Sequence, residues 1–233
     1  MAQVISLPVQ KVASAAASAT AVTTWDVDDW GRDATLARIA GGLLRLRWNV
    51  AVGGQERLPA EGPGLVVVNA RHFMLTPWIA ALALGHEVGR PVRFVGRPDT
   101  APVGALARRL GGLLDRPDEV ASALRDGQLL VVGAAGVFDP GKVGEIDHRV
   151  IGAAVRTSTP VFPAAVSVSP IGRSARIEVA DAVRPPRRRR GPFAELELAD
   201  RLEAALGELL DSSAAPRTGT PLDWIPLGLS GGR

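Results

Sequence analysis

The stretch from Gly64 to Gly85 constrains the fold of this chain more than any other. It opens with a run of Leu and Val residues, 65–68, whose apolar side chains predict a strand buried on both faces. Polar residues follow from Asn69, and then an apolar helix is expected from Pro77 to Leu84, with Thr76 as its N-cap. A strand that ends in polar side chains at the start of a helix is where α/β proteins bind ligands. We therefore expect the functional site here.

The alternation of strand and helix continues on both sides of this stretch. Further strands are expected at 48–52, 92–96, 113–114, 128–132, 161–168 and 175–179. Further helices are expected at 33–46, 101–110, 118–125, 147–157 and 193–210. Strands and helices in this order predict an α/β layered fold, with a largely parallel or mixed central sheet flanked by helices.

Two of these helices carry apolar faces that we expect to be buried. In helix 33–46 the face consists of Leu36, Ile39, Ala40, Leu43 and Leu44. In helix 193–210 the residues spaced for burial are Leu196, Leu198, Leu202, Leu206, Leu209 and Leu210. For the first helix, packing on the domain's own core is favoured over lying on a membrane, although Arg38 and Arg45 on its opposite face would suit either.

The composition limits the chemistry and the domain organisation. The chain has no cysteine, which excludes disulfides and a thiol nucleophile. The chain contains no run of 18 consecutive apolar residues, so we predict no transmembrane helix. Residues 1–24 lack a basic start and an unbroken apolar run, so a disordered tail is favoured over a signal peptide. We expect one domain, 25–211, and a C-terminal tail, 212–233, whose apolar residues could contact the domain itself or a protein partner.

Four segments in register carry a family resemblance. They are VVVNARHFMLTP, FVGRPDTAPVGALARRLGG, LRDGQLLVVGAAGVFDPGK and AAVRTSTPVFPAAVSV. Their order resembles the glycerolipid (lysophospholipid, or 1-acylglycerol-3-phosphate) acyltransferase family over most of residues 25–210, and WDVDDWGRD is similar to the start of one bacterial branch. The resemblance implies that family's layered fold. It also implies acyl-CoA or acyl-carrier protein and a lysophospholipid-like lipid as partners, and no cofactor.

The motifs that carry the family's chemistry are altered here. The family uses a histidine as base and an aspartate five residues later to orient it. Aligned on Thr76 and Pro77, the histidine position falls on Arg71 and the aspartate position on Thr76. Aligned on His72, the aspartate position falls on Pro77. The glutamate of the family's Pro-Glu-Gly-Thr motif falls on Ala135, so neither alignment restores the catalytic set.

Two interpretations are consistent with these differences. In one, His72 is the base and works with a carboxylate from elsewhere, such as Asp139 or Asp147, in an active acyltransferase. In the other, which we favour, the protein binds lipid or acyl thioester but is catalytically weak or inactive. A non-catalytic regulatory partner of an active relative is a further alternative. The resemblance and the charges together give a set of substrate contacts: Asn69, Arg71, Thr76, Arg97, Gly136 and Lys142.

The remaining motifs concern surfaces and ions. The run Arg187, Arg188, Arg189 and Arg190 suits an anionic membrane. Nucleic acid is less favoured, because aromatic residues are not interleaved with these arginines. The segment GVFDPGKV lacks the hydroxyl that a P-loop needs after Lys142. His86 and His148 show no metal-ligand spacing, so no metal is expected. The expected location is cytoplasmic, with peripheral contact to the inner face of the plasma membrane.

Overall fold

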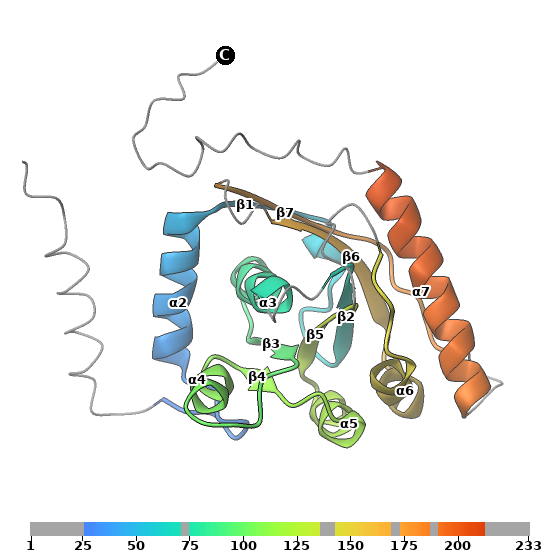
Figure 1. Ribbon diagram of the computed structural model, residues 1–233, viewed down its shortest axis with the longest axis horizontal. Helices are drawn as coiled ribbons and strands as arrows, with labels where there is room; N and C mark the ends of the chain where they lie inside the picture. Colours follow the sequence, from blue (N-terminus) through green and yellow to red (C-terminus); the bar gives the residue numbers. More distant parts are fainter. Residues whose placement is uncertain (1–25, 71–74, 136–142, 169–172, 187–190, 213–233) are drawn as a thin grey trace, which may run out of the picture.

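The computed structural model describes residues 26–70, 75–135, 143–168, 173–186 and 191–212 (Figure 1). Its strands are β1 (Asn49–Gly53), β2 (Gly64–Val68), β3 (Val92–Val95), β4 (Gly112–Leu113), β5 (Leu129–Gly133), β6 (Val161–Val168) and β7 (Ser174–Val179). Its helices are α2 (Ala34–Arg47), the 3-10 turn η1 (Gln55–Arg57), α3 (Leu75–Val88), α4 (Val103–Arg109), α5 (Pro117–Arg125), α6 (His148–Thr157) and α7 (Pro192–Ser212). Every expected strand and helix is therefore present, with ends shifted by a few residues.

The strands form one sheet in the order β1-β7-β6-β2-β5-β3-β4. All neighbouring pairs are parallel except β6 and β7, which are antiparallel. The predicted α/β layered fold with a largely parallel, mixed sheet is confirmed. β2 and β5 lie at the centre of the sheet, which explains why both are uninterrupted apolar runs.

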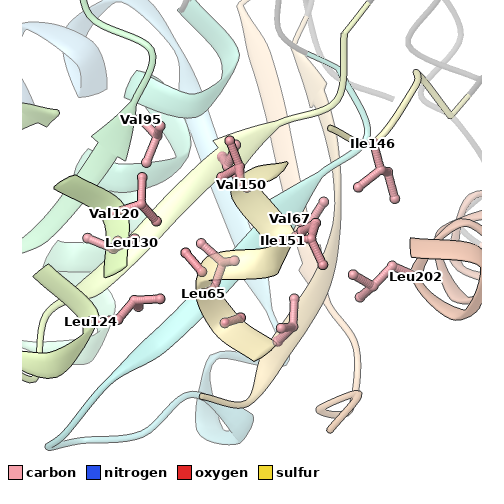
Figure 2. Close-up of a cluster of buried hydrophobic side chains, with 14 of the residues drawn as sticks. Leu65, Val67, Val95, Val120, Leu124, Leu130, Ile146, Val150, Ile151 and Leu202 are labelled. Carbon is pink, nitrogen blue, oxygen red and sulfur yellow. The ribbon is translucent and has the colours of Figure 1, made fainter. Parts of the chain in front are cut away.

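Helices cover both faces of the sheet, and each face has its own core (Figure 1). Leu65 and Val67 of β2 point to the face covered by α5, α6 and α7, where they contact residues such as Ile151 and Leu202 (Figure 2). Val66 and Val68 point to the opposite face, where α3 contributes Ala80 and Leu84. The two-residue period of a strand thus distributes one apolar run between two cores.

Three details of the helices differ from the sequence expectations. Leu43 of α2 is 56% exposed and Leu196 of α7 is 48% exposed, so burial was wrongly predicted for both. In α2 the buried side chains are Ala37 and Leu44, because the helix contacts the domain through a narrower stripe than its apolar face provides. Thr76 is not the N-cap of α3, because this helix already includes Leu75.

The acidic lead-in before α2 is bound to the sheet through a buried arginine. Arg93, in β3, is 2% exposed, and its Nη2 donates to Asp28 Oδ2 at 2.6 Å. Its Nε donates to Gln128 Oε1 at 2.9 Å. The other oxygen of Asp28 accepts from the backbone N–H groups of Trp30 and Arg32, at 3.1 and 2.9 Å. Asp28 therefore shapes the turn and also fixes it against the sheet.

Candidate functional site

The candidate site lies at the carboxyl ends of three adjacent strands, β2, β5 and β3. The register pairs Val68 with Gly133 and Phe94 with Val131. Asn69 directly follows β2, Ala134 directly follows β5, and Arg97 is the second residue after β3. Because the carboxyl ends of parallel strands meet at one edge of a sheet, these residues lie at the same edge. Asn69 and Arg97, two of the predicted site residues, thus follow strands that only β5 separates.

Asn69 is fully buried, and its side chain takes the place of a backbone hydrogen-bond acceptor between β2 and β6. β2 pairs with β6 only as far as Val68 and Ala164. Beyond that point Asn69 Oδ1 accepts from the Val166 N–H at 2.7 Å, so the side chain extends the hydrogen-bonding ladder after the main chain has turned away. The Asn69 carbonyl accepts from Gly144 N–H at 2.9 Å. Asn69 therefore fixes the turn after β2 to both β6 and the segment 143–145.

Segment 143–145 closes the loop that follows β5. Ala135 and Glu145 exchange both backbone hydrogen bonds, at 2.8 and 2.9 Å. Gly144 has no room for a side chain, because a Cβ atom there would lie 2.5 Å from the Ala135 carbonyl oxygen. Sequence reasoning missed Gly144 and Val166, since nothing in the local sequence indicates that either one contacts Asn69.

The residues that border segments 71–74 and 136–142 are therefore close together. Asn69 and Ala70 precede residues 71–74, while Ala135 and Val143 flank residues 136–142. The predicted site residues Arg71, His72, Gly136 and Lys142 belong to these two segments and lie outside the described residues, as does Asp139.

The positions for the family's aspartate are both in the first turn of α3. Thr76 is 4% exposed, and Pro77 is also buried. Neither can supply a carboxylate to a histidine in the preceding loop. Asp147, one of the two carboxylates suggested as a partner for His72, is the N-cap of α6, where its Oδ1 accepts from the Arg149 N–H at 2.9 Å.

Arg97 borders an open groove of about 690 Å³ beside α4. Its Nε atom is buried and has no hydrogen-bond partner among the described residues, and its Nη1 donates to the Pro98 carbonyl oxygen at 3.3 Å. The groove is also lined by Val27, Arg108 and Asp99, whose Oδ2 accepts from Arg116 Nη2 at 2.8 Å. Three arginines, Arg97, Arg108 and Arg109, and one aspartate therefore line this groove, and guanidinium groups are suited to bind an anionic ligand.

Charge at the far end of this groove is compensated. Arg109 Nη2 donates to Asp33 Oδ2 at 2.7 Å. Burial raises the pKa of Asp33, but the hydrogen bonds from Leu36 N–H and Arg109 outweigh it, and the pKa lies below its usual value. Asp33 also caps α2, so this ion pair joins α2 to α4.

Within the described part of the chain, no group of three His, Cys, Asp or Glu side chains is arranged to hold a metal ion. No described helix is long and apolar enough to cross a membrane. The arginine run 187–190 lies outside the described residues.

We compared the sequence and the fold of this chain with known proteins. No family model and no curated protein matches the chain. Solved structures do match, among them the crystal structure of the 1-acyl-sn-glycerophosphate (LPA) acyltransferase PlsC from Thermotoga maritima. That structure aligns with a TM-score of 0.56 and 22% sequence identity, over 78% of each chain. The chain therefore has the α/β fold of an acyltransferase, as its sequence motifs implied.

Proposed function

We propose that this protein binds a lipid or an acyl thioester at the carboxyl ends of β2, β5 and β3, with weak or absent transferase activity. One observation supports the proposal: in a chain with this fold, the sequence resemblance puts Thr76 or Pro77 at the position of the family's catalytic carboxylate, and neither residue is an acid. The scaffold and its loop anchors are retained, whereas the acid that would orient the base is missing.

The missing carboxylate matters because acyl transfer requires a proton to leave the attacking hydroxyl group. The acceptor's hydroxyl oxygen attacks the thioester carbonyl, a base takes the hydroxyl proton, and the C–S bond breaks to release the thiol. A positioned base contributes about 10²- to 10⁴-fold to such a rate. Without a carboxylate to fix its tautomer and orientation, His72 would be a poor base. An active enzyme that uses His72 with a different carboxylate is the alternative.

Binding has support that does not depend on catalysis. Arg97 and Arg108 line a groove of about 690 Å³, which is large enough for a phosphate-bearing ligand. Acyl-CoA and lysophospholipids both join a phosphate to an acyl chain. Arg71, Gly136 and Lys142 would then complete the anion contacts from the two adjacent loops, and Asn69 and Thr76 would shape the floor.

A peripheral membrane location is part of this proposal, with the cytoplasmic face of the plasma membrane as the surface. Phe193 is 79% exposed at the start of α7, and Leu196 is exposed one turn later. Both come directly after the arginine run 187–190. Exposed apolar side chains beside a cluster of arginines are typical of contact with an anionic bilayer. Flotation with anionic vesicles should weaken when the four arginines become glutamine, and unchanged flotation would remove this surface from the proposal.

Ligand binding is tested by titrating the protein with acyl-CoA and with lysophosphatidic acid. The matched variants are Arg97→Ala and Arg149→Ala, because each removes one arginine and Arg149 lies exposed on α6, on the opposite face of the sheet. We expect Arg97→Ala to weaken binding about tenfold and Arg149→Ala to leave it unchanged. Equal affinities for all three proteins, or no binding by the wild type, would contradict the proposal.

A further inference from the structure

A second groove, of about 350 Å³, lies between α2 and α3. The two helices lie next to each other on the same side of the sheet, with α2 seen from the side and α3 seen nearly end-on (Figure 1). Small residues of both helices, including Ala37, Gly41 and Gly85, line this groove. His86, which also lines it, is ten residues beyond Thr76, about 15 Å further along the axis of α3. The groove is therefore separate from the candidate site, and a ligand bound in it would be independent of the proposed function.

The charged side chains that line this α2–α3 groove are all basic. Arg32, Arg38, Arg45 and Arg90 line it together with His86, and none of its lining residues in the described part of the chain is acidic. Arg90 already has a structural role, because its two terminal nitrogens donate to the carbonyl oxygens of Gly62 and Gly127 at 2.9 and 2.7 Å. Its guanidinium ties the start of β3 to neighbouring turns.

The other three arginines lack a paired carboxylate. Among the described residues, no carboxylate lies within ion-pair distance of Arg32, Arg38 or Arg45. Arg45 Nη1 instead lies 2.6 Å from His86 Nε2, so a cation contacts a second basic group. Arg32 Nε is buried, and no described residue offers it a hydrogen-bond acceptor. Burial and the nearby Arg93 lower the pKa of Arg32 by more than the surrounding aspartates raise it, which indicates that its charge is poorly stabilised.

We propose that the α2–α3 groove binds a phosphate group, with Arg32, Arg38 and Arg45 as its ligands. The planar guanidinium group suits phosphate because it donates two parallel hydrogen bonds. The volume accommodates inorganic phosphate or a small phosphate ester. The carbonyl groups at the end of α3 oppose an anion, but their partial charge is smaller than the charge of three guanidinium groups. The phosphate could come from solution or from a lipid head group.

The test compares two double variants of the full chain. Arg38→Ala/Arg45→Ala removes two exposed arginines from the groove. Arg125→Ala/Arg149→Ala is the matched control, because it removes two exposed arginines from α5 and α6 and gives the same net charge. Inorganic phosphate and glycerol phosphate are titrated calorimetrically at constant ionic strength. A parallel flotation assay uses phosphatidylcholine vesicles with and without phosphatidic acid.

We expect saturable one-to-one binding of phosphate or of phosphatidic acid vesicles by the wild type. The groove variant should bind at least about tenfold more weakly, while the control should be unchanged. If the groove variant loses affinity only for the soluble phosphates, the ligand is a free phosphate ester. If it loses affinity only for the vesicles, the ligand is a lipid head group. An equal loss of affinity in the groove variant and the control would indicate nonspecific attraction and would overturn the proposal. The absence of saturable binding by the wild type would also overturn it. The acyl-CoA affinity of the groove variant should match that of the wild type, which separates this test from that of the proposed function.

Discussion

Asn69 should be among the most sensitive polar positions of the domain. In Asn69→Ala the buried N–H of Val166 loses the side-chain acceptor that lies 2.7 Å away in the wild type, and an unsatisfied buried donor costs about 1–3 kcal/mol. The space left by the amide adds to this cost. We expect the free energy of unfolding to fall by about 2–4 kcal/mol, out of a total of about 5–15 kcal/mol for a typical domain.

Urea denaturation measures this loss directly. The midpoint should fall while the slope stays constant, since the surface exposed on unfolding is unchanged. Asn49→Ala is the matched control, because Asn49 is exposed at the start of β1, and its change should stay within about 0.5 kcal/mol. A loss in Asn69→Ala no larger than that of the control would refute the structural role assigned to this side chain.

The pH dependence of the stability of Asn69→Asp tests the same hydrogen bond to Val166 N–H. The carboxyl group keeps an acceptor for Val166 N–H, but at a fully buried position its charged form is disfavoured, so its folded-state pKa is raised above about 3.9. A group with a raised folded-state pKa contributes stability below its unfolded-state pKa and loses it as the pH rises through the folded-state value. The variant should therefore be destabilised at neutral pH and recover in acid. A pH-independent deficit would contradict this reasoning.

Three further changes probe the packing and the ion pairs. Ile151→Ala, on the buried face of α6, should lower the free energy of unfolding by about 2–5 kcal/mol in urea denaturation; a loss below about 1 kcal/mol would contradict the packing. Gly144→Ala should lower the melting temperature and weaken acyl-CoA binding, because its Cβ would displace the Ala135 carbonyl; wild-type behaviour would exclude this close contact. Asp33 has a lowered pKa, so it stabilises the fold above about pH 4 and loses this contribution as the pH falls further. Asp33→Asn, which keeps a good N-cap, should cost about 1 kcal/mol or less at neutral pH and reduce the loss of stability in acid; an unchanged acid profile would contradict the pairing with Arg109.

The sequence predicted the elements and layers because their signals are local. The apolar runs of β2 and β5 indicate burial on both faces, and the alternation of strands with helices indicates a mostly parallel sheet. The antiparallel pairing of β6 with β7 was not predicted, although only residues 169–173 separate the two strands and a parallel crossover needs a dozen or more. The burial of Leu43 and Leu196 was wrongly predicted because helical periodicity does not give the width of the contact stripe.

The candidate site was only partly predictable, because its contacts join distant segments. The polar turn after β2 was recognised, yet the role of Asn69 depends on Val166, 97 residues away. Arg93 was taken as part of an ordinary strand, because its partners Asp28 and Gln128 lie 65 and 35 residues away in the sequence. Resemblance to a family supplied the location of the site, whereas the structure supplied the anchors of its loops.

The loss of the proton-transferring pair is tested most directly by acyl transfer itself. The measurement is the rate at which wild type and His72→Ala transfer a labelled acyl chain from acyl-CoA, or from acyl-carrier protein, to lysophosphatidic acid. Our account predicts that both proteins bind acyl-CoA with the same affinity and that both transfer it no faster than the uncatalysed background. Transfer by the wild type that is reduced about 10²-fold or more in His72→Ala would contradict the account and establish His72 as a working base.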